Sequence, residues 1–538
     1  NKNFEDRVYY SHGSDVRLSS VSLNARGLSK PLTKEIESIK GVSSVSPSVR
    51  VIGTDVTKTF GSDSIAVLGI DTNNFEQSVW YRDDFSESSL AEISNTLQDT
   101  DTKGIELPDR SRSFGVLVKS DKSRPTTALL ARMKDKNGRY FSYDLGRLDS
   151  GGWTLKQVEI FGRGRSQLFP TRPLTLMSIG IVETNPQKKL TSGSILIDSV
   201  RVRLATGEVF NLEDFRDIND WQIINSSISS TNDRLGISEI SAKSDSSAIF
   251  TWSEGPPITM RGIYPATKFK PISAIVNSDF LINTQYSLGD QLKVSIGGHR
   301  IDVVLRDKVR YFPTINPIED DFIVVGLDPL IHRLNIGLLF GSTDPNEFWI
   351  DYEDGITNET KMGLKEDLIN DPPFSYGKLW DTESMLEIVR VDPLVKAGWH
   401  AILVIAFGSI LLLSAIGFFS HAYISYRNRR FQFALLRTLG FSTRQLITTI
   451  WVEQVLIITL GMIIGTWMGG RLSEAVMPFL SSDDYGNQVI PPFVIQIDWV
   501  NLLITYGVMI LIFAAVIGSL IFLARRLVLN KMLRLGDT

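Results

Sequence analysis

The chain has 538 residues, of which 22% are charged, with a formal net charge of −4 and no cysteine. The absence of cysteine excludes disulfides, thiolate metal sites and cysteine nucleophiles. The length predicts several domains. Up to residue 396 the chain is polar, with 46 basic and 54 acidic residues. That balance of −8 argues against nucleic acid as a partner, because nucleic-acid binding needs a basic face.

The first segment, residues 1–103, mixes helical and strand patterns. Leu32–Ile39 has helical spacing of apolar residues, whereas Val49–Ile52 and Ser64–Ile70 have the composition of strands. This alternation predicts the first part of an α+β domain.

Residues 104–252 change to an all-β pattern. Trp153–Phe161, Leu174–Val182 and Ser194–Leu204 alternate or are rich in β-branched residues, and Ile195–Val202 reads as a half-buried strand. The spacing predicts an inserted antiparallel sandwich. Gly193–Asp198 resembles the jelly-roll sandwiches of carbohydrate-binding modules.

The inserted segment offers two weak ligand candidates. Tyr140, Trp153, Phe161 and Phe169 could form a sugar-stacking platform, but filling the sandwich core is the favoured interpretation. Asp198 could ligate a structural calcium, but a solvated strand aspartate is favoured, because calcium needs several converging oxygens.

The α+β pattern returns over residues 253–396. Gln291–Ile296 and Arg300–Leu305, joined through Gly297-Gly298, predict a hairpin, and Asp321–Val325 predicts a further strand. We therefore expect one α+β domain, split by the sandwich, which leads into the last domain.

Residues 397–538 are predicted to form a transmembrane domain. The runs Ala397–Tyr426, Leu446–Gly470 and Trp499–Ala524 contain a single formal charge, Glu453. Each exceeds the roughly 20 residues that a membrane helix needs. They predict membrane helices at about 399–424, 446–470 and 499–524.

The basic residues predict the orientation. The loop 427–445 has five arginines and no acid, and the C-terminal tail is also basic, whereas the loop after the second helix is mainly acidic. By the positive-inside rule the first loop and the C-terminus are cytoplasmic, and residues 1–396 are extracytoplasmic. Export of so large a domain predicts a further membrane helix or signal upstream. The lack of cysteine favours a bacterial cell membrane.

The loop 427–445 is the most informative segment. Phe433, Leu436 and Leu439 recur at helical spacing, Gly440 is a candidate helix stop, and Ser442 is a candidate cap for the next helix. The pattern predicts a short amphipathic helix at the inner membrane surface. An ordinary basic interfacial anchor would give the same pattern.

In sequence, the loop resembles the signature of the FtsX-like permease family, which includes MacB-type and lipoprotein-releasing transporters. The pattern Arg-x-x-Glu-Phe-Ala-Leu-Leu-Arg-x-Leu-Gly is matched by residues 429–440, except that Gln432 stands where the family usually has Glu. A downstream acid is matched by Glu453, and a glycine-rich second helix by Gly461, Gly465, Gly469 and Gly470.

The resemblance implies a permease that works with separate ABC-type ATPase subunits, which bind ATP and Mg²⁺. No Walker-A pattern occurs in the chain. It also implies a second permease copy or a homologous half. The residues expected to contact the ATPase are Arg430, Gln432, Leu436, Arg437, Gly440 and Phe441. Glu453 and the glycines would serve helix packing or coupling, and Glu453 could pair with Arg444 or Arg437 or face headgroup water. We expect no catalytic residue, metal or cofactor in this chain.

Three other functions compete. An ATPase-coupled regulator of a cell-envelope hydrolase would use the same machinery without moving a substrate. A membrane-anchored glycan-binding protein would need one membrane helix, so three argue against it. A membrane enzyme is disfavoured, because the five histidines are scattered and no nucleophile motif occurs.

Overall fold

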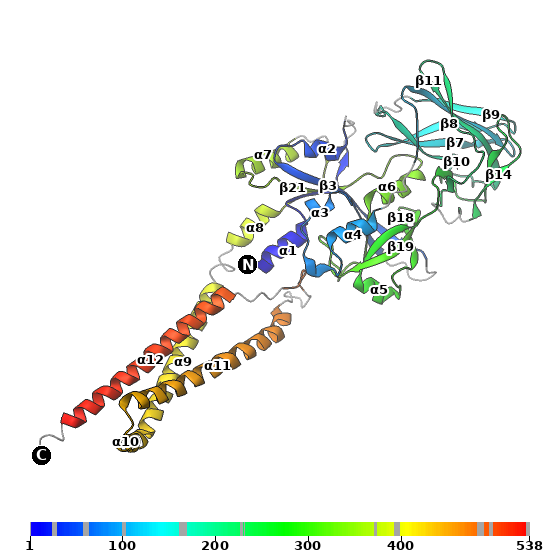
Figure 1. Ribbon diagram of the computed structural model, residues 1–538. Coiled ribbons are helices and arrows are strands. Elements are labelled where there is room, and N and C mark those ends of the chain that lie inside the picture. Colours follow the sequence, from blue (N-terminus) through cyan, green and yellow to red (C-terminus); the bar gives the residue numbers. More distant parts are fainter. Residues whose placement is uncertain are drawn as a thin grey trace. The chain divides into compact units, whose positions relative to one another are not determined.

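The computed structural model describes residues 2–23, 30–57, 64–98, 104–160, 169–225, 230, 232–370, 374–391, 399–480, 489–493 and 499–533. The chain divides into two compact units (Figure 1). The β-rich unit comprises Val8–Glu383, and the helical unit comprises Asn1–Arg7 with Ser384–Thr538.

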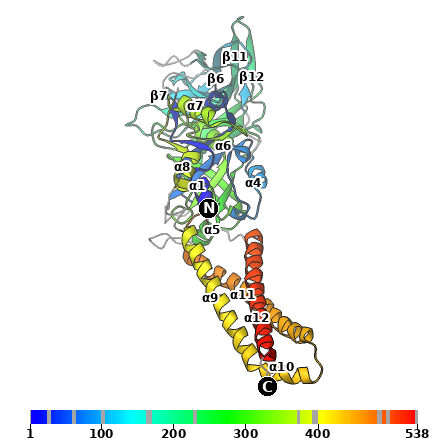
Figure 2. The same ribbon diagram turned by 90° about the vertical axis from the view of Figure 1, so that its left-hand side faces the viewer.

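The helical unit contains the three predicted membrane helices (Figure 2). Their stretches that are long and apolar enough to cross a membrane are Val404–Ser425, Trp451–Ser473 and Leu502–Ser519, which confirms the prediction. The first and third of these helices pack together, and the ring centroids of Phe418 and Phe513 are 4.9 Å apart. All three are longer than the sequence predicts. The helices are α9 (Trp399–Asn428), α10 (Arg430–Thr438), α11 (Thr443–Leu480) and α12 (Trp499–Leu533).

The β-rich unit is built on a nine-stranded sheet of order β18-β19-β17-β20-β4-β3-β21-β1-β23. Its strands come from both sides of the inserted segment, because β4 pairs in parallel with β20, some 250 residues later in the chain. The predicted strand Ser64–Ile70 and the predicted hairpin are confirmed. The strands are β1 (Val16–Ser19), β3 (Val42–Asp55), β4 (Ser64–Ile70), β17 (Ile272–Asn277), β18 (Gln291–Ile296), β19 (His299–Val309), β20 (Phe322–Gly326), β21 (Glu347–Tyr352) and β23 (Lys378–Asp381).

Helices cover both faces of the central strands. Val67 and Ile323 point into one core with α5 and α6, whereas their neighbours Leu68 and Val324 point into another with α3 and α4. Burial on both faces explains the nearly continuous apolar sequence of β20. The helices of this unit are α1 (Lys2–His12, which begins in the helical unit), α2 (Leu32–Glu37), α3 (Phe75–Ser78), η1 (Asp83–Phe85), α4 (Leu90–Leu97), α5 (Ser278–Thr284), α6 (Leu327–Ile336), α7 (Asn358–Ile369) and the start of α8 (Thr382–Val391); β2 (Ser22–Leu23) pairs with β22 (Phe374–Ser375).

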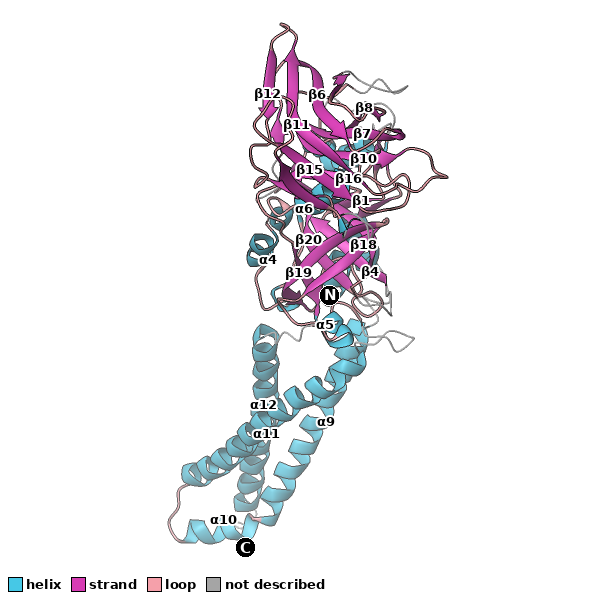
Figure 3. Cartoon of the chain, turned by 90° about the vertical axis from the view of Figure 1, so that its right-hand side faces the viewer, coloured by secondary structure: helices cyan, strands magenta, loops and turns pink. Residues whose placement is uncertain are grey.

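Two further sheets form an antiparallel sandwich (Figure 3). One has the order β13-β16-β10-β7-β8, with β5 beside β10, and the other has the order β14-β15-β11-β6-β9, with β12 beside β11. Their inner faces share one apolar core. The last strand, β16, lies beyond residue 252. The strands are β5 (Ile105–Glu106), β6 (Ser111–Ser120), β7 (Arg124–Asp135), β8 (Tyr140–Leu148), β9 (Thr154–Glu159), β10 (Leu174–Glu183), β11 (Gly193–Leu204), β12 (Val209–Glu213), β13 (Trp221–Ile223), β14 (Arg234–Ser238), β15 (Ser247–Trp252) and β16 (Arg261–Pro265).

The prediction of a half-buried strand at Ile195–Val202 is wrong. Ile195 and Ile197 point into the sandwich core, but Leu196 and Asp198 on the opposite face are buried as well. The segment of residues 239–246 is bonded to Asp198 from that side. Asp198 is therefore not a solvated strand aspartate: its side chain accepts hydrogen bonds from the chain itself.

Candidate coupling site

The loop between α9 and α11 contains the short helix α10, and Gly440 ends it as predicted. Gly440 has φ +94°, a left-handed conformation that glycine adopts at low cost. The backbone N–H of Phe441 donates to the carbonyl oxygen of Leu436 at 3.1 Å, the six-to-one hydrogen bond of a Schellman ending. The direction in which the chain leaves α10 is thereby fixed.

The next helix begins with a capping box, which confirms the predicted cap at Ser442. The Ser442 hydroxyl oxygen accepts from the backbone N–H of Gln445 at 3.3 Å, and the Ser442 N–H donates to Gln445 Oε1 at 2.9 Å. The connection from α10 to α11 is therefore a short turn with defined hydrogen bonds at both ends.

An ion pair joins the start of this loop to α11. Arg429 Nη1 lies 2.7 Å from Glu453 Oε2, and both side chains are partly exposed. Sequence reasoning proposes Arg444 or Arg437 as partners of Glu453 and does not name Arg429; the side chain of Arg437 lies outside the described part of the chain. A pair as exposed as this contributes about 1 kcal/mol or less, so it can open and re-form readily. The 24-residue separation of the two side chains gives no signal in the sequence.

The loop presents apolar side chains that the helical unit does not cover. Phe431 is 79% exposed and Leu439 71% exposed, and Leu435 and Phe441 are also exposed. We call these four residues the loop surface. The predicted contact residues do not include Phe431, Leu435 or Leu439, although the family pattern specifies leucine at positions 435 and 439.

The predicted contact residues are distributed unevenly. Gln432, Gly440 and Phe441 are exposed, whereas Leu436 is half-buried. The side chains of Arg430 and Arg437 lie outside the described part of the chain. Leu439 therefore offers more apolar surface to a partner than the predicted Leu436.

The glycines of α11 do not pack closely against α9 or α12. A Cβ atom added at Gly461, Gly465 or Gly469 would meet no atom of the described residues within 4 Å. These glycines instead line a cavity of about 1200 Å³ between α9, α11 and α12. The Thr466 hydroxyl on the same helix is hydrogen-bonded to the Tyr506 hydroxyl of α12.

Tyr140 is not available for the suggested aromatic platform. Tyr140 is only 7% exposed and belongs to an apolar cluster that includes Ile336 of α6, so it cannot stack on a sugar. Trp153 is half-buried, Phe169 is exposed, and Phe161 lies outside the described residues. Burial raises the pKa of Tyr140, which keeps its phenol neutral.

The contact with α6 explains why Tyr140 is buried. Arg132, on the same outer face of the sandwich, donates from Nε to the carbonyl oxygen of Asn335 at 3.1 Å and from Nη2 to that of Gly341 at 2.9 Å. Ser178 donates to the carbonyl oxygen of Ile336 at 2.7 Å. Burial lowers the pKa of Arg132 to about 10, so the guanidinium remains charged at neutral pH. One face of the sandwich is thus used to hold it against the nine-stranded sheet's helix α6.

Comparison with known proteins agrees with the loop sequence. Residues 404–529 match the family model described as FtsX-like permease C-terminal. No curated protein matches the sequence. Among solved structures, the periplasmic region of MacB from Actinobacillus actinomycetemcomitans is similar, with 7% sequence identity over 73% of this chain and 99% of that chain. Its TM-score of 0.24 is too low for the likeness to carry an argument about fold or function.

Proposed function

We propose, from the premise that residues 404–529 belong to the FtsX-like permease family, that this chain is the permease subunit of an ABC-type transporter. ATP and Mg²⁺ bind to separate ATPase subunits on the cytoplasmic side. ATP binding moves the loop surface, and the membrane helices pass this movement to the extracytoplasmic β-rich unit. The work done there is export or another task in the envelope.

The observation that carries the proposal is the loop surface. Four apolar side chains in and just after a nine-residue helix are exposed, although hydrogen bonds fix the direction in which the chain leaves that helix. A partner that binds such a surface gains by covering apolar area and loses little entropy, because the turn is already ordered. The arginines of this loop favour the cytoplasmic side, where an ATPase subunit is found.

Coupling requires that the partner make different contacts in two states. The partly exposed Arg429–Glu453 pair can open and re-form at low cost, whereas the Schellman turn moves as a rigid piece. We infer that the ATPase tilts α10 and the start of α11 together. A second copy of the permease, or a homologous half, completes the complex, and the exposed apolar faces of α9, α11 and α12 contact membrane lipid or further helices.

The test replaces two apolar residues by aspartate, and the native side chains at the two positions are equally exposed. Leu439 on the loop surface and Ile52 on β3 are both 71% exposed. The full-length chain is purified from its native membrane in mild detergent, and co-purifying subunits are identified by mass spectrometry. We expect an ABC-type ATPase to co-purify with the wild type and with Ile52→Asp. The amount of co-purified ATPase should fall by about tenfold or more with Leu439→Asp, as is common for interface anchors.

The absence of an ATPase from the folded wild-type protein refutes the proposal, as does its full retention by Leu439→Asp. The same preparation addresses the alternative of an ATPase-coupled regulator. A cell-envelope hydrolase captured with the ATPase would favour regulation over export.

A further inference from the structure

The two ends of the β-rich unit lie beside each other in the nine-stranded sheet. β1 follows α1 after three residues, and β23 is followed directly by α8. These two strands pair antiparallel, from Val16 opposite Asp381 to Ser19 opposite Lys378. The connections from both strands toward the helical unit are therefore short, and they leave the sheet at the same place.

Side chains cross-link the two connections. Thr382 donates its hydroxyl hydrogen to the carbonyl oxygen of Ser14 at 2.5 Å and its N–H to that of Asp15 at 3.0 Å. His12 Nδ1 lies 3.2 Å from the Thr382 hydroxyl oxygen, and since that hydroxyl hydrogen is already used, the imidazole is the donor. Burial lowers the pKa of His12 to about 4, so it is neutral at pH 7.

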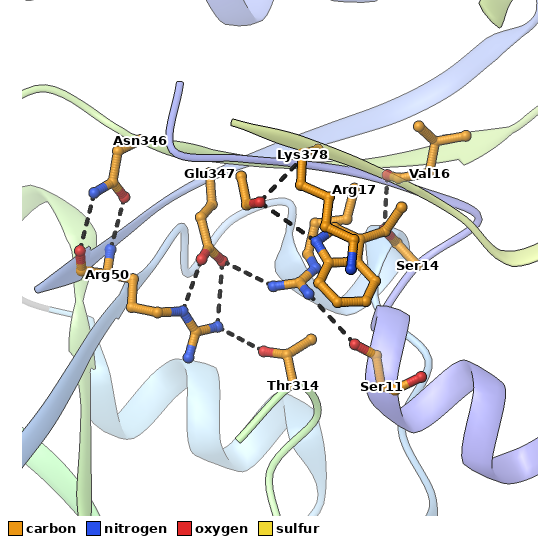
Figure 4. Close-up of polar contacts among 11 residues, drawn as sticks. Ser11, Ser14, Val16, Arg17, Arg50, Thr314, Asn346, Glu347 and Lys378 are labelled. Atoms are coloured by element: carbon orange, nitrogen blue, oxygen red, sulfur yellow. Dashed lines mark hydrogen bonds and ion pairs between the residues drawn. The ribbon is translucent and has the colours of Figure 1, made fainter. Parts of the chain in front are cut away.

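Arg17 of β1 ties this corner to the rest of the sheet (Figure 4). Its Nη1 donates to Glu347 Oε2 of β21 at 3.4 Å, and its Nη2 donates to the carbonyl oxygen of Ser11 in the last turn of α1 at 3.3 Å. The guanidinium carbon lies 5.0 Å from the ring centroid of Trp380 of β23. One side chain thus contacts the end of α1, the neighbouring strand on one side and the neighbouring strand on the other.

Glu347, which accepts from Arg17, is also bonded from a second direction. Glu347 also accepts from Arg50 Nε of β3 at 2.7 Å, and Arg50 Nη2 donates to the Thr314 hydroxyl at 2.6 Å. Arg17 and Glu347 are both buried. Burial lowers the pKa of Arg17 to about 10 against the opposing effect of Glu347, so the guanidinium is charged at neutral pH.

A buried ion pair is a costly way to stabilise a sheet, because apolar side chains of similar size often do as well. An apolar side chain at position 17 could pack on Trp380, but it could not bind the carbonyl of Ser11 and the carboxylate of Glu347. The distinctive effect of the guanidinium is orientation: it fixes the end of α1 relative to β21 and β23.

We propose that Arg17, paired with Glu347, is the joint that delivers movement of α1 and α8 to the nine-stranded sheet as one displacement. Without the Arg17–Glu347 pair the strands remain paired, but the last turn of α1 can shift relative to the sheet. Movement of α1 then no longer displaces the sheet. The joint rests on the proposed function, because it transmits what the ATPase supplies.

The experiment uses the full-length chain with its co-purified ATPase in lipid nanodiscs. The measured quantity is the change in amide hydrogen exchange of residues 8–383 when ATP and Mg²⁺ are added. Arg17→Lys keeps the charge but lacks the planar fork that reaches two acceptors. Arg17→Met with Glu347→Leu replaces both partners by apolar groups. The control, Arg261→Met with Asp233→Leu, removes an equally buried ion pair from the sandwich.

We expect both joint variants to bind the ATPase and to exchange like the wild type in β4 and β20 without nucleotide; β3 is not used as a reference, because its Arg50 loses Glu347 in the double variant. Their ATP-dependent change should fall by about fivefold or more, within the ordinary range of coupling free energies, whereas the control keeps it. A change within about twofold of the wild type in Arg17→Lys, or an equal loss in the control, overturns the joint. A wild-type preparation that contains no ATPase overturns the proposed function instead, and the joint with it.

Discussion

Asp198 holds the segment of residues 239–246 over the outer face of β11, and its replacement by asparagine should free that segment. Oδ2 accepts from the backbone N–H groups of Ala242 at 2.5 Å and Lys243 at 3.0 Å and from the Ser241 hydroxyl at 3.0 Å, and Oδ1 accepts from the Ser244 hydroxyl at 2.7 Å. Asp198→Asn keeps the shape but turns an NH₂ group toward one set of donors.

The expected loss follows from the number of bonds. Hydrogen bonds to a charged group contribute about 1.5–3 kcal/mol each. In Asp198→Asn at least one acceptor position is lost, and the remaining hydrogen bonds are to an uncharged group. We therefore expect the free energy that holds the segment of residues 239–246 in place to fall by about 3 kcal/mol. Burial alone would raise the pKa of Asp198, but the hydrogen bonds from Ser244, Ala242, Lys243 and Ser241 lower it overall. Because the folded pKa lies below the unfolded value of about 3.9, the contribution is present above about pH 4 and is lost as the pH falls through the folded pKa.

Amide hydrogen exchange of the full-length protein measures this directly. A loss of about 3 kcal/mol corresponds to exchange about 100-fold faster at Ala242 and Lys243. Asp245→Asn is the matched control, because Asp245 lies exposed in the same segment. The reasoning is refuted if both amides of Asp198→Asn exchange at the wild-type rate, or if the control accelerates them equally. Addition of a calcium chelator to the wild type should have no effect on either amide.

Three further changes test other parts of the chain. Burial, and after it the hydrogen bond with Asp15, raises the pKa of Asp351 to about 7. The folded state therefore loses stability as the pH rises from about 4 to 7 and this carboxyl group is deprotonated. In thermal unfolding, the stability of Asp351→Asn relative to the wild type should rise by on the order of 1–2 kcal/mol from pH 5 to pH 8, a value reduced for the partial exposure of the side chain. Gly262→Ala places a Cβ against the carbonyl oxygen of Ile179, so it should lower stability by about 1–3 kcal/mol, seen as faster proteolysis of the sandwich. Gly440→Val should lose more co-purified ATPase than Gly440→Asn, because asparagine adopts positive φ more readily.

Features with a local signal could be predicted. The strand Ser64–Ile70 has the composition of a strand, and the hairpin has two strand-like runs joined by Gly297-Gly298; the structure has both. The ending of α10 at Gly440 depends on one residue's conformational freedom, and the cap at Ser442 on one nearby hydroxyl. In each case the stabilising interactions lie within a few residues, or between adjacent strands.

Features set by distant segments could not be predicted. Asp198 lies on the face of the strand that the alternation predicts to be exposed, and a segment some 45 residues later bonds to it there. For Tyr140 the sequence favours the sandwich core over a platform, but the residue is buried on the outer face by contact with α6, almost 200 residues away. The Arg17–Glu347 pair spans 330 residues. A sequence without an alignment contains no information on such pairs beyond the residue types.

The contacts made by the two outer faces of the sandwich also bear on the glycan-binding alternative. α6 occupies the outer face of the sheet that contains Tyr140, and the segment held by Asp198 covers part of the outer face of the other sheet. A glycan that bound near the middle of β11 would have to displace that segment. Asp198→Asn therefore separates the two functions: if the sandwich binds glycan there, the variant should bind more of it, because the competing segment is released. If the sandwich binds no glycan there, the variant should only be less stable, and an envelope-polysaccharide column should retain no more of it than of the wild-type protein.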